Sequence, residues 1–277
     1  MIKLTEYFYQ LSSHRALRFM PRIIFGMLII VWITSFPYRH LVWGSSSVLM
    51  RSAMPDSLLE NFMFQLYYQP HLFPWVYYTH AVMAVLSLWN HRAAFAARFI
   101  AWITGVMLYQ TAPGLHGASI FVLLNFACVL IPVHYDNERG WRQWLNAVSF
   151  LALRIQTFVV LTTAVLFMWG SLQWMAGSAL YYLFHQTALV RGFVTEFAIQ
   201  SKSMLQIVNL TLLVLASILP LALIWRRSRY LAALSMLIAG TISLLIFQHI
   251  GIGLAINALA LPWIDGRSSY GTTSTPQ

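Results

Sequence analysis

Long runs of apolar residues, separated by short polar stretches, dominate the pattern along this chain of 277 residues. A transmembrane helix needs about 20 predominantly apolar residues to cross the hydrocarbon core of a bilayer. Seven runs are therefore predicted to be spanning helices: Pro21–Phe36, Pro74–Trp89, Phe95–Tyr109, His116–Val133, Ala147–Trp169, Met204–Trp225 and Tyr230–Gln248. An eighth run, Ile250–Ile264, is too short to span upright and is predicted to be a re-entrant or interfacial piece, or half of one long bent helix.

The composition of the chain agrees with this pattern. Hydrophobic residues make up 59% of the chain and charged residues only 9%, whereas a soluble domain carries about 25% charged residues. The surface of a soluble domain of this size needs more polar cover than these residues provide. The expected fold class is all-α, a polytopic transmembrane helical bundle with seven or eight membrane segments. Residues 1–267 are predicted to form a single transmembrane domain, and the polar tail 268–277 to be disordered.

The distribution of basic residues predicts how the chain is oriented in the membrane. With the N-terminus in the cytoplasm, 11 of the 17 Lys and Arg residues fall on the cytoplasmic side, namely Lys3, Arg15, Arg18, Arg22, Arg92, Arg98, Arg139, Arg142, Arg226, Arg227 and Arg229. The opposite side has four, namely Arg39, Arg51, Arg191 and Lys202. Because cytoplasmic loops carry an excess of Lys and Arg, we expect a multi-pass protein of the inner (cytoplasmic) membrane. Nucleic acid is not expected as a partner, since no basic domain lies outside the membrane segments.

Two loops on the opposite, outward side are long, whereas the cytoplasmic loops are short. Tyr38–Phe73 and Tyr181–Ser203 are both predicted to be amphipathic segments that lie on the membrane or cap the bundle. Recognition or chemistry is therefore expected to face outward.

Arg154 and Gln156 introduce polar groups near the start of the fifth apolar run. A charge at the centre of a bilayer costs about 2.5–3.5 kcal/mol on insertion scales. One interpretation is that Arg154 extends back to the cytoplasmic interface. The other is that it faces the bundle and binds a ligand, a lipid headgroup or backbone carbonyls, because no acidic residue lies within any predicted span. Arg154 and Gln156 are candidate catalytic residues on the second interpretation.

His80 and His249 are two further candidate catalytic residues. A neutral histidine in a bundle transfers protons or donates a hydrogen bond to a quinone-like carbonyl, but it more often joins two helices through a hydrogen bond. No His-x-x-His or His-x-x-x-His pair occurs, and Cys128 is the one cysteine. The sequence therefore gives no support to a metal site.

Two short motifs carry a resemblance to a known family. Arg154-x-Gln156 precedes an apolar stretch that leads to Trp174-x-x-Gly177-x-Ala179-Leu180-Tyr181, and the last apolar run contains His249-x-Gly251-Ile252-x-Leu254. Together these patterns resemble the HTTM domain, the membrane portion shared by vitamin K-dependent gamma-carboxylase and its bacterial relatives. The resemblance covers about residues 12–265 and makes Trp174 and Gly177 candidate cofactor-binding residues.

One departure from the family pattern bears on the expected function. Carboxylase-like members carry a lysine shortly before the Trp-x-x-Gly motif, whereas this chain has no lysine between Lys3 and Lys202. The resemblance therefore implies the SdpB-like branch, in which a membrane protein works with an SdpA-like companion protein to mature or export a secreted peptide toxin. The alternative is a membrane enzyme that acts on a quinone or another lipid-soluble substrate, with Arg154, Gln156, His80 and His249 lining its cavity. A bound quinone or lipid is the cofactor that this alternative implies.

Overall fold

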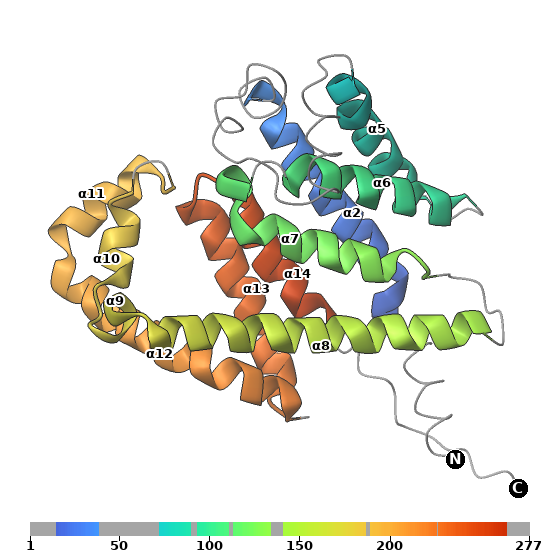
Figure 1. Ribbon diagram of the computed structural model, residues 1–277. Coiled ribbons are helices and arrows are strands. Elements are labelled where there is room, and N and C mark those ends of the chain that lie inside the picture. Colours follow the sequence, from blue (N-terminus) through green and yellow to red (C-terminus); the bar gives the residue numbers. More distant parts are fainter. Residues whose placement is uncertain are drawn as a thin grey trace, which may run out of the picture.

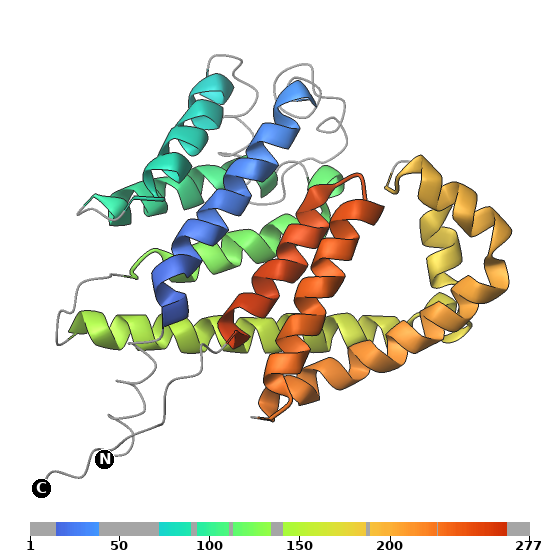
Figure 2. The ribbon, with the colours of Figure 1, turned by 180° about the vertical axis from the view of Figure 1, so that it is seen from behind.

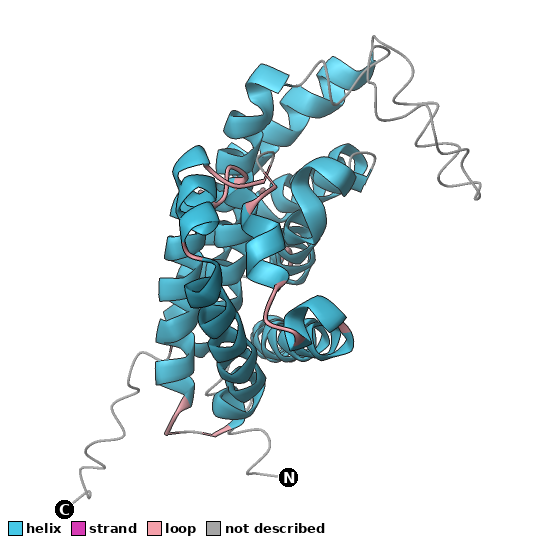
Figure 3. Cartoon of the chain, turned by 90° about the vertical axis from the view of Figure 1, so that its left-hand side faces the viewer, coloured by secondary structure: helices cyan, strands magenta, loops and turns pink. Residues whose placement is uncertain are grey.

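The computed structural model describes residues 15–38, 72–89, 93–110, 113–133, 141–186, 189–225 and 227–264. The described chain is helical, and Figure 3 shows its helices joined by short loops without a strand. The longer helices are α2 (Arg15–Ser35), α5 (Leu72–Leu86), α6 (Ala94–Gln110), α7 (Pro113–Leu130), α8 (Trp141–Gly170), α12 (Lys202–Ile224), α13 (Arg229–Ile246) and α14 (Ile250–Ala260). The 3₁₀ turns η1 (Phe36–Tyr38) and η2 (Leu261–Trp263) follow α2 and α14.

Each predicted apolar run coincides with one of these helices, so the all-α class is confirmed. Within the described residues, three helices are long and apolar enough to cross a membrane, namely α8, α12 and α13. The other apolar helices of the described chain are shorter. Helix α8 has 30 residues and is therefore about 45 Å long, which exceeds the roughly 30 Å of a bilayer's hydrocarbon core.

The longer helices of the described chain alternate in direction along the sequence. In Figure 1 the first residues of α2, α6, α8 and α13 lie toward the lower right, and those of α5, α7, α12 and α14 lie toward the upper left. Figure 2 shows the same alternation from behind, with α14 between α2 and α13 and with α8 crossing behind the lower part of α13. The connections from α5 to α6, α6 to α7, α12 to α13 and α13 to α14 are short, which favours antiparallel neighbours.

The hydrophobic core lies where α2, α5, α6, α7, α14 and the first half of α8 meet. Phe25, Leu28, Leu124 and Phe150 are among its fully or almost fully buried side chains. The buried residues of α8 end at Thr157, and the second half of this helix exposes large apolar side chains such as Leu166 and Phe167. In a membrane, lipid or protein must cover that second half.

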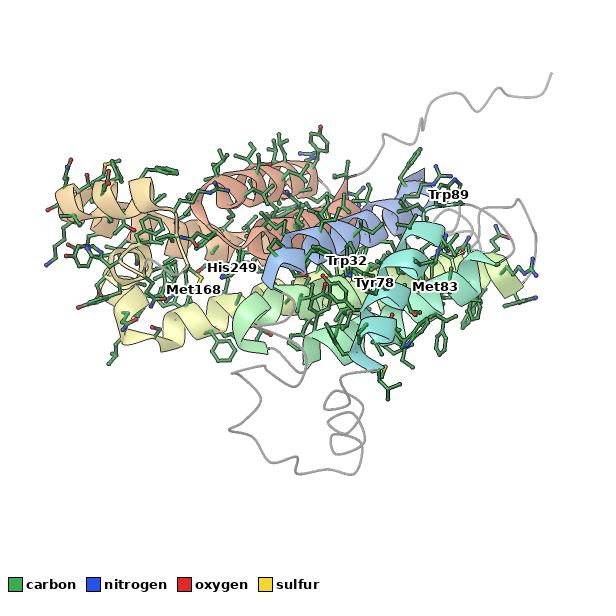
Figure 4. The ribbon with its side chains drawn as sticks, turned by 90° about the horizontal axis from the view of Figure 1, so that it is seen from above. Trp32, Tyr78, Met83, Trp89, Met168 and His249 are labelled. Atoms are coloured by element: carbon green, nitrogen blue, oxygen red, sulfur yellow. The ribbon has the colours of Figure 1, made fainter. Side chains whose placement is uncertain are left out.

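An aromatic contact joins α2 to α5. The indole Nε1 of Trp32 donates to the carbonyl oxygen of Tyr77 at 3.1 Å, and the Tyr77 hydroxyl donates to the carbonyl oxygen of Trp32 at 3.3 Å. Tyr78 lies beside Trp32 in Figure 4, with 6.5 Å between the ring centroids. The indole N–H and the hydroxyl thus both have hydrogen-bond partners, while the aromatic rings pack between the two helices.

Three short helices connect α8 to α12: α9 (Leu172–Met175), α10 (Ala179–Phe184) and α11 (Gly192–Gln200). We call residues 171–201 the lobe, because these helices project from the bundle in Figures 1 and 2. The lobe accounts for most of the predicted outward segment Tyr181–Ser203. The other predicted outward segment falls almost entirely on residues 39–71, which lie outside the described residues, as does the tail 268–277.

Candidate functional site

Arg154 faces the bundle and binds a backbone carbonyl. Its Nε donates to the carbonyl oxygen of Pro262 at 3.1 Å. Its guanidinium carbon lies 4.5 Å from the centre of the Phe150 ring and 5.1 Å from that of the Trp263 ring. Of the two orientations considered from the sequence, the structure has the one directed into the bundle, with a carbonyl as partner.

Helix geometry explains why a cation is placed at this point. The last carbonyls of a helix have no intrahelical donors and carry partial negative charge, so a cation stabilises them. Pro262 follows the C-terminal end of α14, which lies inside the apolar core. The Thr157 hydroxyl lies 3.3 Å from the carbonyl oxygen of Leu259, one turn earlier. Arg154 and Thr157 thus attach the end of α14 to α8.

Arg98 repeats this arrangement at another helix end. Its side chain is 2% exposed, and its Nη1 donates to the carbonyl oxygen of Val133 at 2.6 Å, just after the end of α7. The sequence analysis counted Arg98 among the cytoplasmic basic residues; the structure shows in addition that its side chain is buried between α6 and the residues that follow α7. The apolar residues on both sides of Arg98 in α6 were the available indication that it is buried.

His80 joins α5 to α6. Its Nδ1 lies 2.8 Å from the carbonyl oxygen of Ala101, so this nitrogen carries the proton, and 3.3 Å from the Thr104 hydroxyl. The side chain is fully buried, and its Nε2 has no hydrogen-bond partner within the described chain. Gly105 allows this contact, because a Cβ there would lie 2.9 Å from the His80 Cε1. The geometry matches the helix-joining interpretation of this histidine.

The Trp174–Leu180 segment is a turn fixed to α12 by one buried amide. Asn209 is fully buried; its Nδ2 donates to the carbonyl oxygen of Trp174 at 2.9 Å, and its Oδ1 accepts from the Leu180 backbone N–H at 3.1 Å. Asn209 was missed by the sequence analysis. Its position as an amide among the apolar residues of α12, one turn after Gln206, was the available indication.

Gly177 is required at the centre of this turn. Its φ of +74° lies in the left-handed region, which L side chains rarely adopt. A Cβ at this position would also lie 2.7 Å from the Gln206 Cγ on α12. Ala179 and Leu180, which complete the motif, are buried. The motif residues therefore have roles in the local structure that do not depend on a cofactor.

His249 and Gln156 lie in two further environments. His249 precedes α14 and is half-buried. Gln156 is half-buried on α8, and its Oε1 has no hydrogen-bond partner in the part of the chain that the structure describes.

The candidate residues do not converge in one cavity. Arg154 lies at the C-terminal end of α14 and His249 at its N-terminal end, so the length of this helix, about 16 Å, separates them. Trp174 and Gly177 lie beyond the end of α8, at least about 24 Å along the helix axis from Arg154. His80 lies between α5 and α6. Within the described residues there is also no group of three or more His, Cys, Asp or Glu side chains that could hold a metal ion.

Comparisons with protein-family models, with curated proteins and with solved structures gave no match to this chain.

Proposed function

We propose that the chain is a multi-pass protein of the inner (cytoplasmic) membrane that acts with a companion protein in the maturation or export of a secreted peptide. It is similar in type to the SdpB-like branch of the HTTM family. The N-terminus lies in the cytoplasm and the lobe lies on the opposite side. Three features support this proposal: the membrane-length helices, the alternation of helix directions and the sequence motif around Gly177.

The observation that carries the proposal is the turn from Trp174 to Leu180. Asn209 binds the backbone groups of Trp174 and Leu180 there, Gly177 adopts a positive φ and Leu180 is buried. The motif forms a defined turn in which the backbone conformation requires the glycine. It therefore supports the resemblance to the HTTM domain.

The same helices support the proposed topology of seven or eight spans. The eight longer described helices alternate in direction, and α14 follows α13 after a short connection. Helices shorter than the bilayer thickness are accommodated by local thinning of the bilayer or by packing against longer neighbours. Reporter fusions after Arg139, Gln186 and Arg226 test this topology: the first and third are expected in the cytoplasm and the second outside.

The companion protein is tested by purification from native membranes in mild detergent, followed by mass spectrometry of proteins and extracted small molecules. A stoichiometric companion that remains bound, and loss of peptide maturation on deletion of the chain, are the expected results. A stoichiometric quinone without a companion would contradict the proposal and support the membrane-enzyme alternative. The distance between Arg154 and His249 is the structural argument against that alternative, because the two cannot line one small site.

A further inference from the structure

The outer face of helix α11 carries two pairs of exposed residues with opposite chemistry. Phe193 and Phe197 are four residues apart and are 61% and 47% exposed. Glu196 and Gln200, also four apart, are exposed beside them. Residues four apart lie on one face of a helix, so α11 has an apolar strip and a polar strip side by side, and the exposed Ile199 lies on the other side of the polar strip.

The opposite face of α11 already has its partners. Val194 and Ala198 are buried within the lobe, and the Thr195 hydroxyl donates to the carbonyl oxygen of Phe184 at 2.9 Å. The orientation of α11 on the lobe is therefore fixed. Phe193 and Phe197 point away from the protein because the packing of the other face requires it.

Basic residues flank this helix at both ends. Arg191 precedes it and Lys202 follows it, and both are exposed. The Lys202 ammonium lies 5.4 Å from the centre of the Tyr181 ring. Glu196 is the one acidic residue in the described part of the lobe. An apolar strip with cations at its ends and aromatic rings nearby is complementary to the interface of an anionic bilayer.

The position of the lobe favours lipid over a protein partner. It connects the ends of α8 and α12, two of the three membrane-length helices within the described chain, and so lies at the level where these helices leave the hydrocarbon core. Large apolar side chains are also exposed on the parts of α12 and α8 nearest the lobe in the sequence, namely Met204, Ile207 and Phe167. Exposed apolar side chains at the ends of two membrane-length helices favour lipid as the neighbour of the lobe.

We propose that α11 lies in the bilayer interface at this end of the molecule, with Phe193 and Phe197 in the acyl region and with Arg191 and Lys202 at anionic phospholipid phosphates. Glu196 and Gln200 face water. The apolar face of an interfacial helix is buried about 5–10 Å into the boundary between headgroups and acyl chains, which sets the depth of the two phenylalanines. This inference does not depend on the companion protein or on a peptide substrate.

Spin labels on the two strips test the proposal. In a Cys128→Ala background, single cysteines replace Phe193, Phe197, Glu196 and Gln200, all of which are exposed, so that labelling leaves the packing intact. Collision with oxygen and with a water-soluble nickel complex is measured in vesicles of phosphatidylcholine and phosphatidylglycerol. Labels at 193 and 197 are expected to favour oxygen, and those at 196 and 200 to favour nickel.

Two results would overturn the insertion of α11. Equal nickel access at all four positions would place the helix in water, and protection of positions 193 and 197 from both reagents would show that protein covers them. The proposed contact of Arg191 and Lys202 with lipid phosphates is tested by the double variant Arg191→Gln with Lys202→Gln. Arg227→Gln is the control, because Arg227 is an exposed basic residue before α13. In the double variant, the spin label at position 193 is expected to lie less deep in the bilayer than in the parent protein, and only in vesicles that contain phosphatidylglycerol. An unchanged depth would overturn the assignment of these two cations to lipid phosphates.

Discussion

Arg154 donates from its Nε to the carbonyl oxygen of Pro262 at 3.1 Å, and this bond links the middle of α8 to the end of α14. The last carbonyls of α14 lie within the apolar bundle, where water is not available to satisfy them. A permanent cation within 4.5 Å of the centre of the Phe150 ring and 5.1 Å of that of the Trp263 ring supplies the donor and is itself stabilised by those rings. The charge in an apolar segment thus has a structural reason.

Replacing Arg154 with Met is expected to destabilise the protein. A hydrogen bond from a charged group contributes about 1.5–3 kcal/mol, and we expect the free energy of unfolding in mild detergent to fall by that amount. Arg154→Lys should recover only part of the loss, because an ammonium lacks the planar group that stacks on the two rings. Arg227→Gln, at an exposed position, is the control. Equal stability of Arg154→Met and this control would refute the capping role.

Gly177→Ala is expected to weaken the turn between α9 and α10. The left-handed conformation costs an L residue about 1–2 kcal/mol, and the new Cβ would meet the Gln206 Cγ at 2.7 Å. Gly192→Ala is the matched control, because a Cβ at that position has no neighbour within 4 Å. The double variant Gly177→Ala with Gln206→Ala removes the contact with the Gln206 Cγ and should therefore regain the stability lost to that contact. The stability lost to the left-handed backbone conformation should remain lost. Thermal unfolding of the four proteins measures both components.

Asn209→Leu is expected to release the turn locally. It removes the donor to Trp174 and the acceptor of Leu180, and a buried backbone group left unsatisfied costs about 1–3 kcal/mol. Hydrogen exchange of residues 172–186 should therefore accelerate. Gln206→Leu, which loses only a 3.4 Å exposed bond to Ala176, should leave this exchange nearly unchanged. Similar exchange in both variants would mean that Asn209 does not hold the turn.

The helices could be predicted from the sequence because their pattern is local. The run Met204–Trp225 and helix α12 (Lys202–Ile224) differ by two residues at one end and one at the other. The start of α8 was missed by six residues, because Trp141 and the polar residues that follow it do not form a continuous apolar run. Whether an amphipathic stretch continues a helix depends on what packs against it in the fold, and a count of apolar residues along the sequence does not contain that information.

The contacts of the polar residues could not be predicted in the same way. The sequence indicates that Arg154 and His80 need partners, but their partners are the carbonyls of Pro262 and Ala101, and every residue has such a group. Only the packing of helices selects one carbonyl over another. For the same reason the burial of Arg98 was not predicted and Asn209 was missed.

Gly253→Ala is expected to separate α13 from α14. A Cβ at Gly253 would lie 2.6 Å from the carbonyl oxygen of Gly240 and 2.6 Å from the Leu244 Cγ. Because backbone cannot move aside as a side chain can, the overpacking should cost about 1–3 kcal/mol. Gly26→Ala in α2 is the control, since a Cβ there has no neighbour within 4 Å. Unfolding in mild detergent compares the two, and equal midpoints would contradict the close crossing.

A cysteine pair at Val190 and Phe247 is expected to form a disulfide on oxidation. These residues form an antiparallel bridge, supported by the bond from the Arg191 backbone N–H to the carbonyl oxygen of Ile246 at 3.0 Å and from the Gln248 Nε2 to that of Val190 at 2.9 Å. Antiparallel neighbours have Cα atoms about 4.5–5.5 Å apart, within the range that disulfides require.

The cross-link is made in a Cys128→Ala background and identified by mass spectrometry of a proteolytic digest. Cysteines at Val190 and Ile238, two turns earlier on α13, are the mismatched control and should remain reduced. A disulfide in the first pair alone would fix the tip of the lobe on the connection between α13 and α14. Cross-linking of both pairs would instead indicate that the lobe moves along α13, because a disulfide then forms wherever the thiols meet.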